Sequence, residues 1–338
     1  MNSLEKSILA TLVYYDVLGR PMTGWEVWRY LVRPQPRSRL SDTSFASGKG
    51  RSPQCATSRI LKTLENSLEL AKLISQKNGF YFLKGRFRIV KQRIERQKIA
   101  DQKWKKTKRM VKLLQIIPFI RLVAVSGSLA IGNPKKESDI DLLIVARAGR
   151  IWTCRGLTTL FIHCFGQRRH GLLTKDRFCL NHYLTDKSLK ITSDSLYNAQ
   201  TYAHLVPVLE TESVLYNQFQ KANQWLKDYL FFYPQSQQGY LRKVKPNHFF
   251  TFSRKLKEFI LDKKMGDALE FILRRIQARR ISKDPLIYQS GGRVIFNDEQ
   301  LEFHPDSPEK GILEMYNQKM KEFGLVEFGQ EKDSGLTI

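Results

Sequence analysis

Apolar residues recur with a helical period at the start of the chain. The first of them share one helical face: Leu4, Ile8, Leu9, Leu12 and Val13. Thr23 follows a Gly-Arg-Pro-Met turn and is an N-cap candidate for a second helix over residues 25–31. Residues 33–54 lack periodicity and are rich in Pro, Arg, Ser and Gly, so we expect an exposed, mobile loop. A third amphipathic helix is expected over residues 56–70.

Two short apolar runs then flank Asn78-Gly79, a pair that favours the tight turn of a β-hairpin. Three helices followed by a hairpin resemble the winged-helix family. In that family the third helix enters the DNA major groove and the hairpin touches the backbone. The contacts that this resemblance implies are Ser58, Arg59, Lys62 and Lys77. Glu65 and Glu69 on the same helix oppose such contacts, and winged helices also serve as protein-binding or intramolecular modules, so both interpretations stay open.

Residues 86–117 combine an apolar stripe with a strong excess of cations. Twelve Lys and Arg residues stand against Glu95 and Asp101. We expect a basic connecting helix whose apolar side packs on a neighbouring domain and which ends before Pro118. Like charges at neighbouring helical positions cost stability, and an anionic partner would remove that cost. A solvated connecting helix is the alternative.

Two short apolar runs frame the polar residues around which the rest of the chain is arranged. The first run, residues 120–125, leads into Gly127-Ser128, and the second, residues 140–145, is entered through Asp139 and Asp141. Because strand side chains alternate between faces, both carboxylates are expected to point the same way. Such charges repel each other unless a cation lies between them, and magnesium prefers carboxylate and phosphate oxygens. Glycine permits close approach of the backbone, and serine with the following amides can bind a phosphate.

This arrangement resembles the nucleotidyltransferase superfamily typified by DNA polymerase beta and the aminoglycoside and minimal nucleotidyltransferases. The resemblance rests on Gly-Ser, a spacer and Asp-x-Asp, and covers residues 118–185. It implies catalytic, metal-binding roles for Asp139 and Asp141, and binding of the β- and γ-phosphates by Gly127 and Ser128. The implied cofactor is Mg²⁺, with Mn²⁺ as an alternative ion. The implied substrate is a nucleoside triphosphate such as ATP.

One position departs from the family pattern. The family usually has a third carboxylate, a general base or metal ligand, in the middle of a third strand, here expected over residues 177–185. That position holds Asn181, whose amide cannot accept a proton, and Asp176 and Asp186 at the strand ends are the alternatives. His182 should face away from Asn181 and be a packed histidine. Either the metal or the substrate activates the acceptor, or the enzyme is impaired.

The remainder of the chain is expected to be mainly helical. Glu210 and Glu212 should begin a helix, followed by a core-facing helix over residues 214–230 and a linker over residues 236–246. Residues 252–281 predict one long amphipathic helix with a buried apolar face. Its expected buried residues are Leu256, Phe259, Ile260, Ala268, Leu269, Ile272, Leu273 and Ile276.

The last residues predict a small appendage of two short strands, around 294–296 and 301–305, and a final helix over 309–323. His304 lies at the end of the second of these strands, directly before a proline. It is expected to be a lone structural histidine.

Charge and cysteine content limit the partners. The chain of 338 residues has 57 Lys and Arg against 32 Asp and Glu, a net charge of +25, which favours nucleic acid, nucleoside triphosphates or an anionic membrane surface. Cys55, Cys154, Cys164 and Cys179 lack Cys-x-x-Cys spacing and suggest neither a zinc site nor disulfides, so a reducing cytoplasm is expected. No apolar run reaches membrane-spanning length and no signal-peptide pattern begins the chain, so no membrane partner is expected.

The sequence therefore predicts an α+β protein with a polymerase-beta-like mixed sheet. The expected domains are a winged-helix-like domain (1–85), a basic connecting helix (86–117), a nucleotidyltransferase domain (118–235) and a C-terminal helical region with the appendage (236–338). The first functional hypothesis is metal-dependent nucleotidyl transfer to an unknown acceptor, with release of pyrophosphate. The second is a nucleic-acid-binding regulator whose nucleotidyltransferase domain senses nucleotide or is inactive. An RNA-modifying enzyme that clamps its substrate with the basic helix would combine the two, so RNA or DNA is a further expected partner.

Overall fold

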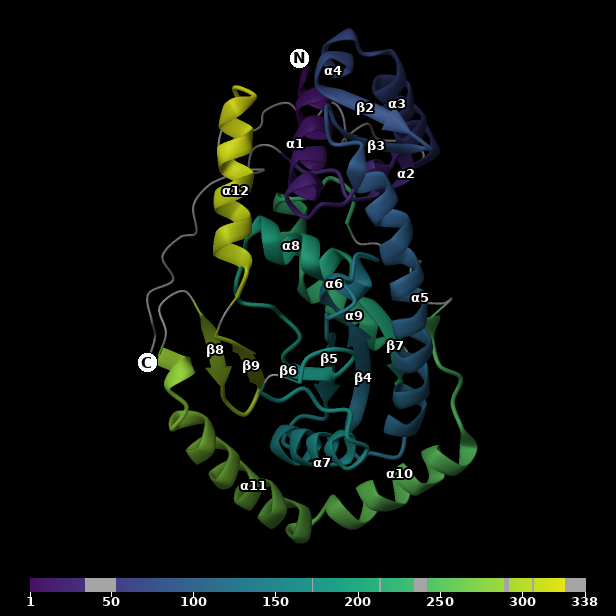
Figure 1. Ribbon diagram of the computed structural model, residues 1–338. Helices are drawn as coiled ribbons and strands as arrows, with labels where there is room; N and C mark the ends of the chain where they lie inside the picture. The colour runs from purple at the N-terminus through teal and green to yellow at the C-terminus, as the bar shows by residue number, and fades with distance from the viewer. Residues whose placement is uncertain are drawn as a thin grey trace.

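A six-stranded mixed sheet forms the centre of the computed structural model, with strand order β7-β4-β5-β6-β9-β8 (Figure 1). The structure describes residues 1–33, 53–171, 173–212, 214–233, 242–288, 292–305 and 307–325, so almost all of the loop predicted over 33–54 and half of the predicted linker lie outside the described residues. The strands are β4 (Ile120–Val125), β5 (Ile140–Ala146), β6 (Phe178–Thr185), β7 (Val206–Glu210), β8 (Arg293–Phe296) and β9 (Gln300–His304). β5 and β6 are parallel and the other neighbours are antiparallel. The predicted α+β class with a mixed sheet is confirmed.

The two strands at the centre are buried on both faces. All residues of β4 are buried, as are those of β5 except Asp141. Leu143 and Val145 pack in one hydrophobic cluster, whereas Leu142 and Ile144 pack in another on the opposite face. This alternation explains why both strands are largely apolar in the sequence, interrupted only by Arg121 in β4 and Asp141 in β5.

The N-terminal residues form helices and a small sheet of order β1-β3-β2. The elements are α1 (Ser3–Val17), β1 (Met22–Thr23), α2 (Gly24–Arg29), α3 (Pro53–Asn66), α4 (Leu68–Leu73), β2 (Ile74–Lys77) and β3 (Phe80–Leu83). Thr23 caps α2 as predicted, in a capping box with Glu26. The helix predicted over 56–70 is divided at Ser67, whose side chain accepts the Leu70 amide and starts α4. Asn78 and Gly79 both have positive φ, as the predicted tight turn requires.

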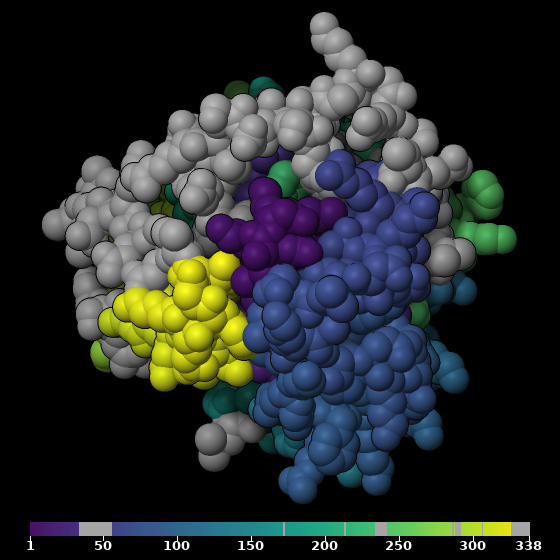
Figure 2. All heavy atoms as spheres, turned by 90° about the horizontal axis from the view of Figure 1, so that it is seen from above, coloured from purple at the N-terminus to yellow at the C-terminus, as the bar shows by residue number. Residues whose placement is uncertain are grey.

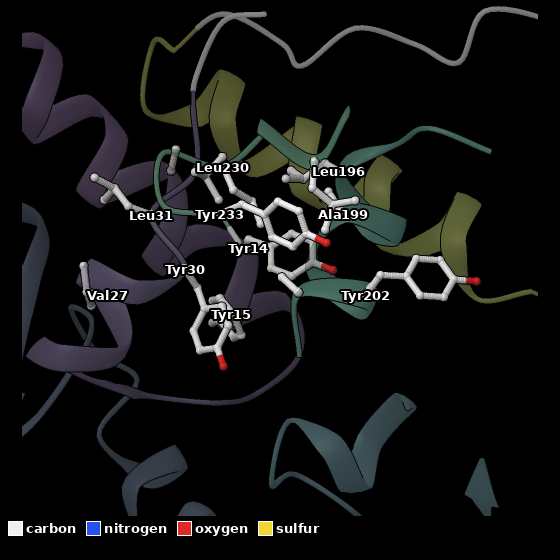
Figure 3. Close-up of a cluster of buried hydrophobic side chains, with 14 of the residues drawn as sticks. Tyr14, Tyr15, Val27, Tyr30, Leu31, Leu196, Ala199, Tyr202, Leu230 and Tyr233 are labelled. Atoms are coloured by element: carbon white, nitrogen blue, oxygen red, sulfur yellow. The ribbon is translucent and has the colours of Figure 1, made fainter. Parts of the chain in front are cut away.

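The N-terminal elements share a hydrophobic core with the central sheet. Helix α8 (Leu196–Ala203), which the sequence analysis did not predict, packs between them, and its Ala199 and Tyr202 lie in one cluster with Tyr14 and Tyr15 of α1 (Figure 3). The Tyr15 hydroxyl donates to Gln200 Oε1 at 2.7 Å. The final helix, α12 (Glu309–Glu322), lies beside α1, where Lys319 forms a 2.7 Å ion pair with Asp16 (Figure 2).

Helix α5 (Arg88–Leu114) connects the N-terminal elements to β4 and runs along the sheet (Figure 1). Several of its cations contact the rest of the protein. Arg93 forms a 2.9 Å ion pair with Glu26, and the buried Lys103 forms a 2.5 Å ion pair with Asp176. Most of the predicted apolar stripe is buried, although Ile94 is exposed. Helix α7 (Ile151–Cys164) covers the same face of the sheet further along.

The prediction for residues 210–230 was partly wrong. Glu210 ends strand β7 and begins no helix; its carboxylate accepts the Tyr216 amide at 2.9 Å. The single helix expected over 214–230 is α9 (Leu215–Ala222) followed by a 3₁₀ turn, η2 (Gln224–Asp228). The two predicted C-terminal strands, β8 and β9, extend the central sheet through pairing of β9 with β6.

The prediction for residues 252–281 was also wrong in two respects. There are two helices, α10 (His248–Leu261) and α11 (Lys264–Ser282), followed by a 3₁₀ turn, η4 (Pro285–Tyr288). Most of the predicted buried face is exposed: Leu256, Phe259, Ile260, Ile272 and Ile276 are each at least 49% exposed. Leu269 and Leu273 are half-buried, and Leu273 packs on the core as predicted.

The helices are held by apolar residues that pack on the core, Leu261, Leu273, Ala278 and Ile281. Polar contacts such as the 2.9 Å ion pair between Glu258 and Arg121 of β4 also hold them. None of the helices in the described part of the chain is both long and apolar enough to cross a membrane.

Candidate active site

The predicted Gly-Ser pair lies where β4 ends beside the start of β5. Gly127 has φ +62°, and a Cβ atom at this position would lie 2.4 Å from Asp141 Oδ2. Glycine is therefore required here both by the backbone conformation and by the close approach of the carboxylate. Ser128 follows in the short helix α6 (Gly127–Ala130), and the Ser126 amide donates to the Asp141 carbonyl at 3.1 Å.

The two predicted carboxylates converge. Ligand atoms of Asp139, Asp141 and Cys179 all lie within 4.8 Å of one another. Burial, together with the charge of Asp139, raises the pKa of Asp141 to about 7. Such a shift shows that the protein environment disfavours two negative charges at this place unless a cation accompanies them.

Arg169 supplies part of the balancing charge, and the sequence analysis did not identify it. Its guanidinium lies 2.7 Å from Asp139 Oδ2 and 3.4 Å from the sulfur of Cys179. Burial raises the pKa of the Cys179 thiol to about 12, so the sulfur stays protonated and adds no charge. The segment that carries Arg169 reaches the site because its backbone pairs with the start of β6, where Arg169 donates its amide to Phe178.

Asn181, the residue that the sequence analysis matched to the family's third carboxylate, lies in the middle of β6. Asn181 lines the same pocket as the two aspartates. The expectation that His182 faces away was wrong, because β6 contains a bulge. In the register of the two strands, Asp141 pairs with Cys179 and Leu143 pairs with His182. Strand β6 therefore has one more residue than β5 between these two pairs. A bulge brings consecutive residues to one face, and both Asn181 and His182 line the pocket.

Neither alternative carboxylate lines this pocket. Asp176 pairs with Lys103, as described above. Asp186, at the other end of β6, accepts the Ala148 amide at 2.9 Å. His304, expected to be a lone histidine, is instead one of a group: His182, Glu302 and His304 have ligand atoms within 4.8 Å of one another. His304 Nδ1 lies 3.3 Å from the amide nitrogen of Asn181.

The charge of this second group is balanced within the protein. Glu302 is buried, and its Oε1 lies 2.6 Å from Arg293 while its Oε2 accepts from Gln300 at 3.0 Å. Burial raises the pKa of the Glu302 carboxyl, but His182 and Arg293 outweigh this effect and hold the pKa below its usual range. Burial lowers the pKa of His304 to about 4 and also lowers that of His182, so both rings are neutral near pH 7.

One pocket of about 510 Å³ joins both groups. Its floor is the sheet face with Asp141 and His182, and its walls come from α1, α6, α8 and α12. Apolar wall residues include Leu18 and Ile312. No local pattern in the sequence indicates that α1 and α12 approach the aspartates, since these elements lie far from them along the chain.

The predicted nucleic-acid contacts lie elsewhere. Arg59 and Lys62 are exposed on α3, where they line a shallow groove with Ser58, and Lys77 is exposed at the end of β2. The structure thus places these side chains on the surface of the N-terminal elements, apart from the pocket with the aspartates.

Comparison with known proteins supports part of this assignment. Residues 102–195 match the family model described as the nucleotidyltransferase domain. The match includes Gly127, Ser128, Asp139 and Asp141, and it supports a general role in nucleotidyl transfer and hence a transferase. A search of curated proteins and a search of solved structures found no match.

The donor set fits a divalent metal of the kind that nucleotidyltransferase domains generally use. Asp139 and Asp141 offer hard carboxylate oxygens, whereas Cys179 is a neutral thiol. Two carboxylates with the remaining positions left to phosphate oxygens and water is the arrangement that magnesium prefers.

Proposed function

We propose that the chain transfers a nucleoside monophosphate from a nucleoside triphosphate to an acceptor and releases pyrophosphate, with Mg²⁺ as its cofactor and Mn²⁺ as a substitute. The observation that carries this proposal is the convergence of Asp139 and Asp141 beside Gly127, within the segment that matches the nucleotidyltransferase domain. The raised pKa of Asp141 supports it, because a bound cation would remove the repulsion that the protein alone leaves.

In this proposal each residue has a stated task. Asp139 and Asp141 hold the metal ion, which when bound stabilises negative charge on the phosphate oxygens. Gly127 leaves room for the triphosphate next to the Asp141 carboxylate, and Ser128 binds its β- and γ-phosphates. Arg169 turns its guanidinium toward the same carboxylates and is positioned to neutralise phosphate charge.

The acceptor would enter from the side of the pocket that Asn181 and His304 line. Asn181 cannot take its proton, whereas the neutral His304 has Nδ1 as a hydrogen-bond acceptor facing Asn181. The pocket walls from α1 and α12 surround this side, so the acceptor we favour is a small molecule or the end of a chain.

The test is incubation of the protein with each labelled nucleoside triphosphate and Mg²⁺, alone, with total RNA and with a small-molecule extract. We expect label on one acceptor class, and a loss of about 10³-fold in rate for Asp139→Asn. Asp186→Asn is the matched control, since its carboxylate lies outside the pocket, and it should keep the rate. Transfer that survives in Asp139→Asn would place the chemistry elsewhere.

A second candidate is a nucleic-acid-binding regulator that senses nucleotide. The exposed cations Arg59, Lys62 and Lys77, and Asn181 in place of a carboxylate, favour it. Filter binding separates the two proposals: DNA or RNA affinity that falls steeply with salt, is lost in Arg59→Glu and is unchanged in Asp139→Asn, without any nucleotide transfer, would favour the regulator.

A further inference from the structure

Helices α10 and α11 expose an apolar face, here called the rim surface because the two helices form one edge of the molecule (Figure 1). On α10 it consists of Phe249, Phe252, Leu256, Phe259 and Ile260, and on α11 of Met265, Phe271, Ile272 and Ile276. Each of these side chains is between 49% and 70% exposed. Of the nineteen large apolar side chains that are exposed in the described residues, nine lie on these two helices. Such a concentration marks a surface that binds something.

The rim surface faces solvent because the opposite sides of these helices attach them to the protein. Leu273, Ala278 and Ile281 of α11 pack on the core, and the acidic residues make polar contacts.

The four acidic residues of α10, α11 and the connection between them each contact the rest of the protein. Glu258 pairs with Arg121 at 2.9 Å, Asp262 with Arg147 at 2.6 Å and Asp267 with Arg150 at 2.6 Å. The fourth acid, Glu270, accepts the amides of Trp152 and Thr153 at the start of α7 at 2.9 and 2.8 Å.

The two helices are also fixed relative to each other. A Cβ atom on Gly266 would lie 1.6 Å from the carbonyl oxygen of Leu261, so the corner between α10 and α11 closes tightly only with glycine. The apolar faces on both sides of this corner are therefore presented together as a fixed surface.

The charges beside the rim surface are positive. α10, α11 and the connection between them contain nine Lys and Arg residues, and among the exposed ones are Lys255, Lys263, Lys264, Arg275 and Arg279. Lys263 lies 5.6 Å from the ring centre of Phe259, and Arg275 lies 5.3 Å from that of Phe271. Cationic and apolar groups are thus adjacent. Each of the four acids is engaged by an arginine or by backbone amides, so the positive charge of this region dominates.

We propose that the rim surface docks on a membrane that contains anionic lipids. The apolar side chains enter the interface, and the neighbouring lysines and arginines lie among the headgroups, as in other interfacial amphipathic helices. A second copy of the chain fits less well, because apposing two rim surfaces brings like charges together. Single-stranded RNA also fits less well, since five of the nine side chains are aliphatic or Met and offer no flat ring for base stacking.

Flotation of the full-length protein with vesicles tests this proposal. We expect binding to vesicles of phosphatidylcholine with phosphatidylglycerol and little binding to pure phosphatidylcholine. The double variant Phe252→Asp/Phe259→Asp should lower the bound fraction at least about tenfold, and Arg275→Glu by about fivefold or more. Both sites are exposed, so the fold should be kept, which circular dichroism checks. Leu68→Asp, at an 82% exposed site on α4, is the matched control and should bind as the wild type does.

Three results would overturn the proposal. The first is absence of binding to the anionic vesicles. The second is binding that salt removes but that the double variant keeps, which would place a purely electrostatic contact elsewhere. The third is a dimer in light scattering, or an RNA complex in filter binding, that the double variant abolishes while vesicle binding is unaffected.

Discussion

Two groups of titratable side chains lie on one face of the central sheet, and their negative charges are balanced differently. Asp139 and Asp141 on the β5 side have Arg169 as a neighbouring cation, and the pKa of Asp141 is raised to about 7 by burial and by Asp139. Glu302 on the β9 side is the more buried carboxylate, yet its pKa is lowered, because His182 and Arg293 outweigh the effect of burial.

This difference distinguishes an aspartate pair whose repulsion a bound cation would relieve from a Glu302 group whose charge the protein itself balances. The aspartate pair gains stability from any cation that enters, whereas the Glu302 group already has its counterion and its hydrogen bonds. The presence of two histidines and a carboxylate within 4.8 Å therefore does not by itself indicate a metal site. With Arg293 at 2.6 Å, a divalent ion at Glu302 would meet a fixed positive charge.

The largest expected effect on stability is at Glu302. Glu302→Gln removes the nearer of the two carboxylates that pair with the half-buried Arg293, the other being Glu309 at 3.4 Å. It should lower the free energy of unfolding by about 3 kcal/mol. Asp141→Asn, measured above pH 7 without metal, should raise it by about 1 kcal/mol because it removes a repulsion. Denaturant titration of both variants measures the two changes. If both variants changed the free energy of unfolding in the same direction, the contrast between the two groups would be contradicted.

Magnesium should stabilise the protein through the aspartates alone. At about a hundred times its dissociation constant, a bound ion adds about 2.7 kcal/mol to the free energy of unfolding. We expect this increase in the wild type and in His304→Asn, and its loss in Asp141→Asn, in thermal melts with and without Mg²⁺. If the stabilisation by Mg²⁺ were lost in His304→Asn, the metal would bind at the group of His182, Glu302 and His304 instead.

Substitution of Gly127, compared with substitution of Gly149, should distinguish the effect of backbone strain on stability from the effect of contact with the Asp141 carboxylate on nucleotide transfer. Gly127→Ala should cost about 1–2 kcal/mol of stability because of its φ of +62°, and its Cβ should also displace Asp141 and reduce nucleotide transfer. Gly149→Ala is the control, since Gly149 has φ +75° but nothing within 4 Å of an added Cβ. It should show a similar loss in denaturant titrations and keep its transfer rate.

The smallest expected effect is a dependence of the protein's stability on pH, which arises from His304 in the second group. Burial lowers the pKa of His304 to about 4, so its neutral form is favoured in the folded state. The associated stability is complete above the unfolded pKa of about 6.5 and is lost as the pH falls toward the folded pKa of about 4, with a loss of about 1–2 kcal/mol already at about pH 5.5. Glu302, His182, Arg293 and Arg169 are the charged and titratable groups that face this ring. A plot of melting temperature against pH should be flatter for His304→Asn than for the wild type.

Local patterns were sufficient to predict the elements near the aspartates. The apolar runs of β4 and β5, the Asn78-Gly79 hairpin and the cap at Thr23 depend on residues close in sequence. The meeting of Gly127 with Asp141 follows from two neighbouring strands, so the pattern of Gly-Ser and Asp-x-Asp was enough to expect it.

Contacts between distant residues could not be predicted in this way. His304 is 123 residues from Asn181, and the bulge that turns His182 into the pocket depends on how β6 pairs with β5. The periodicity of α10 and α11 showed correctly that each has an apolar face. It did not show that Glu258 and Arg121, 137 residues apart, would hold the opposite face against the sheet.

The shared cluster of Tyr14, Tyr15 and Tyr202 has a practical consequence for genetic dissection of this protein. Helix α1 supplies both part of that cluster and a wall of the pocket that contains the aspartates. Deleting the N-terminal elements would therefore open the interior and remove one wall of the pocket with the aspartates in the same step. The two proposed functions, nucleic-acid binding and nucleotide transfer, can be tested one at a time only by single substitutions, because truncation would impair both together.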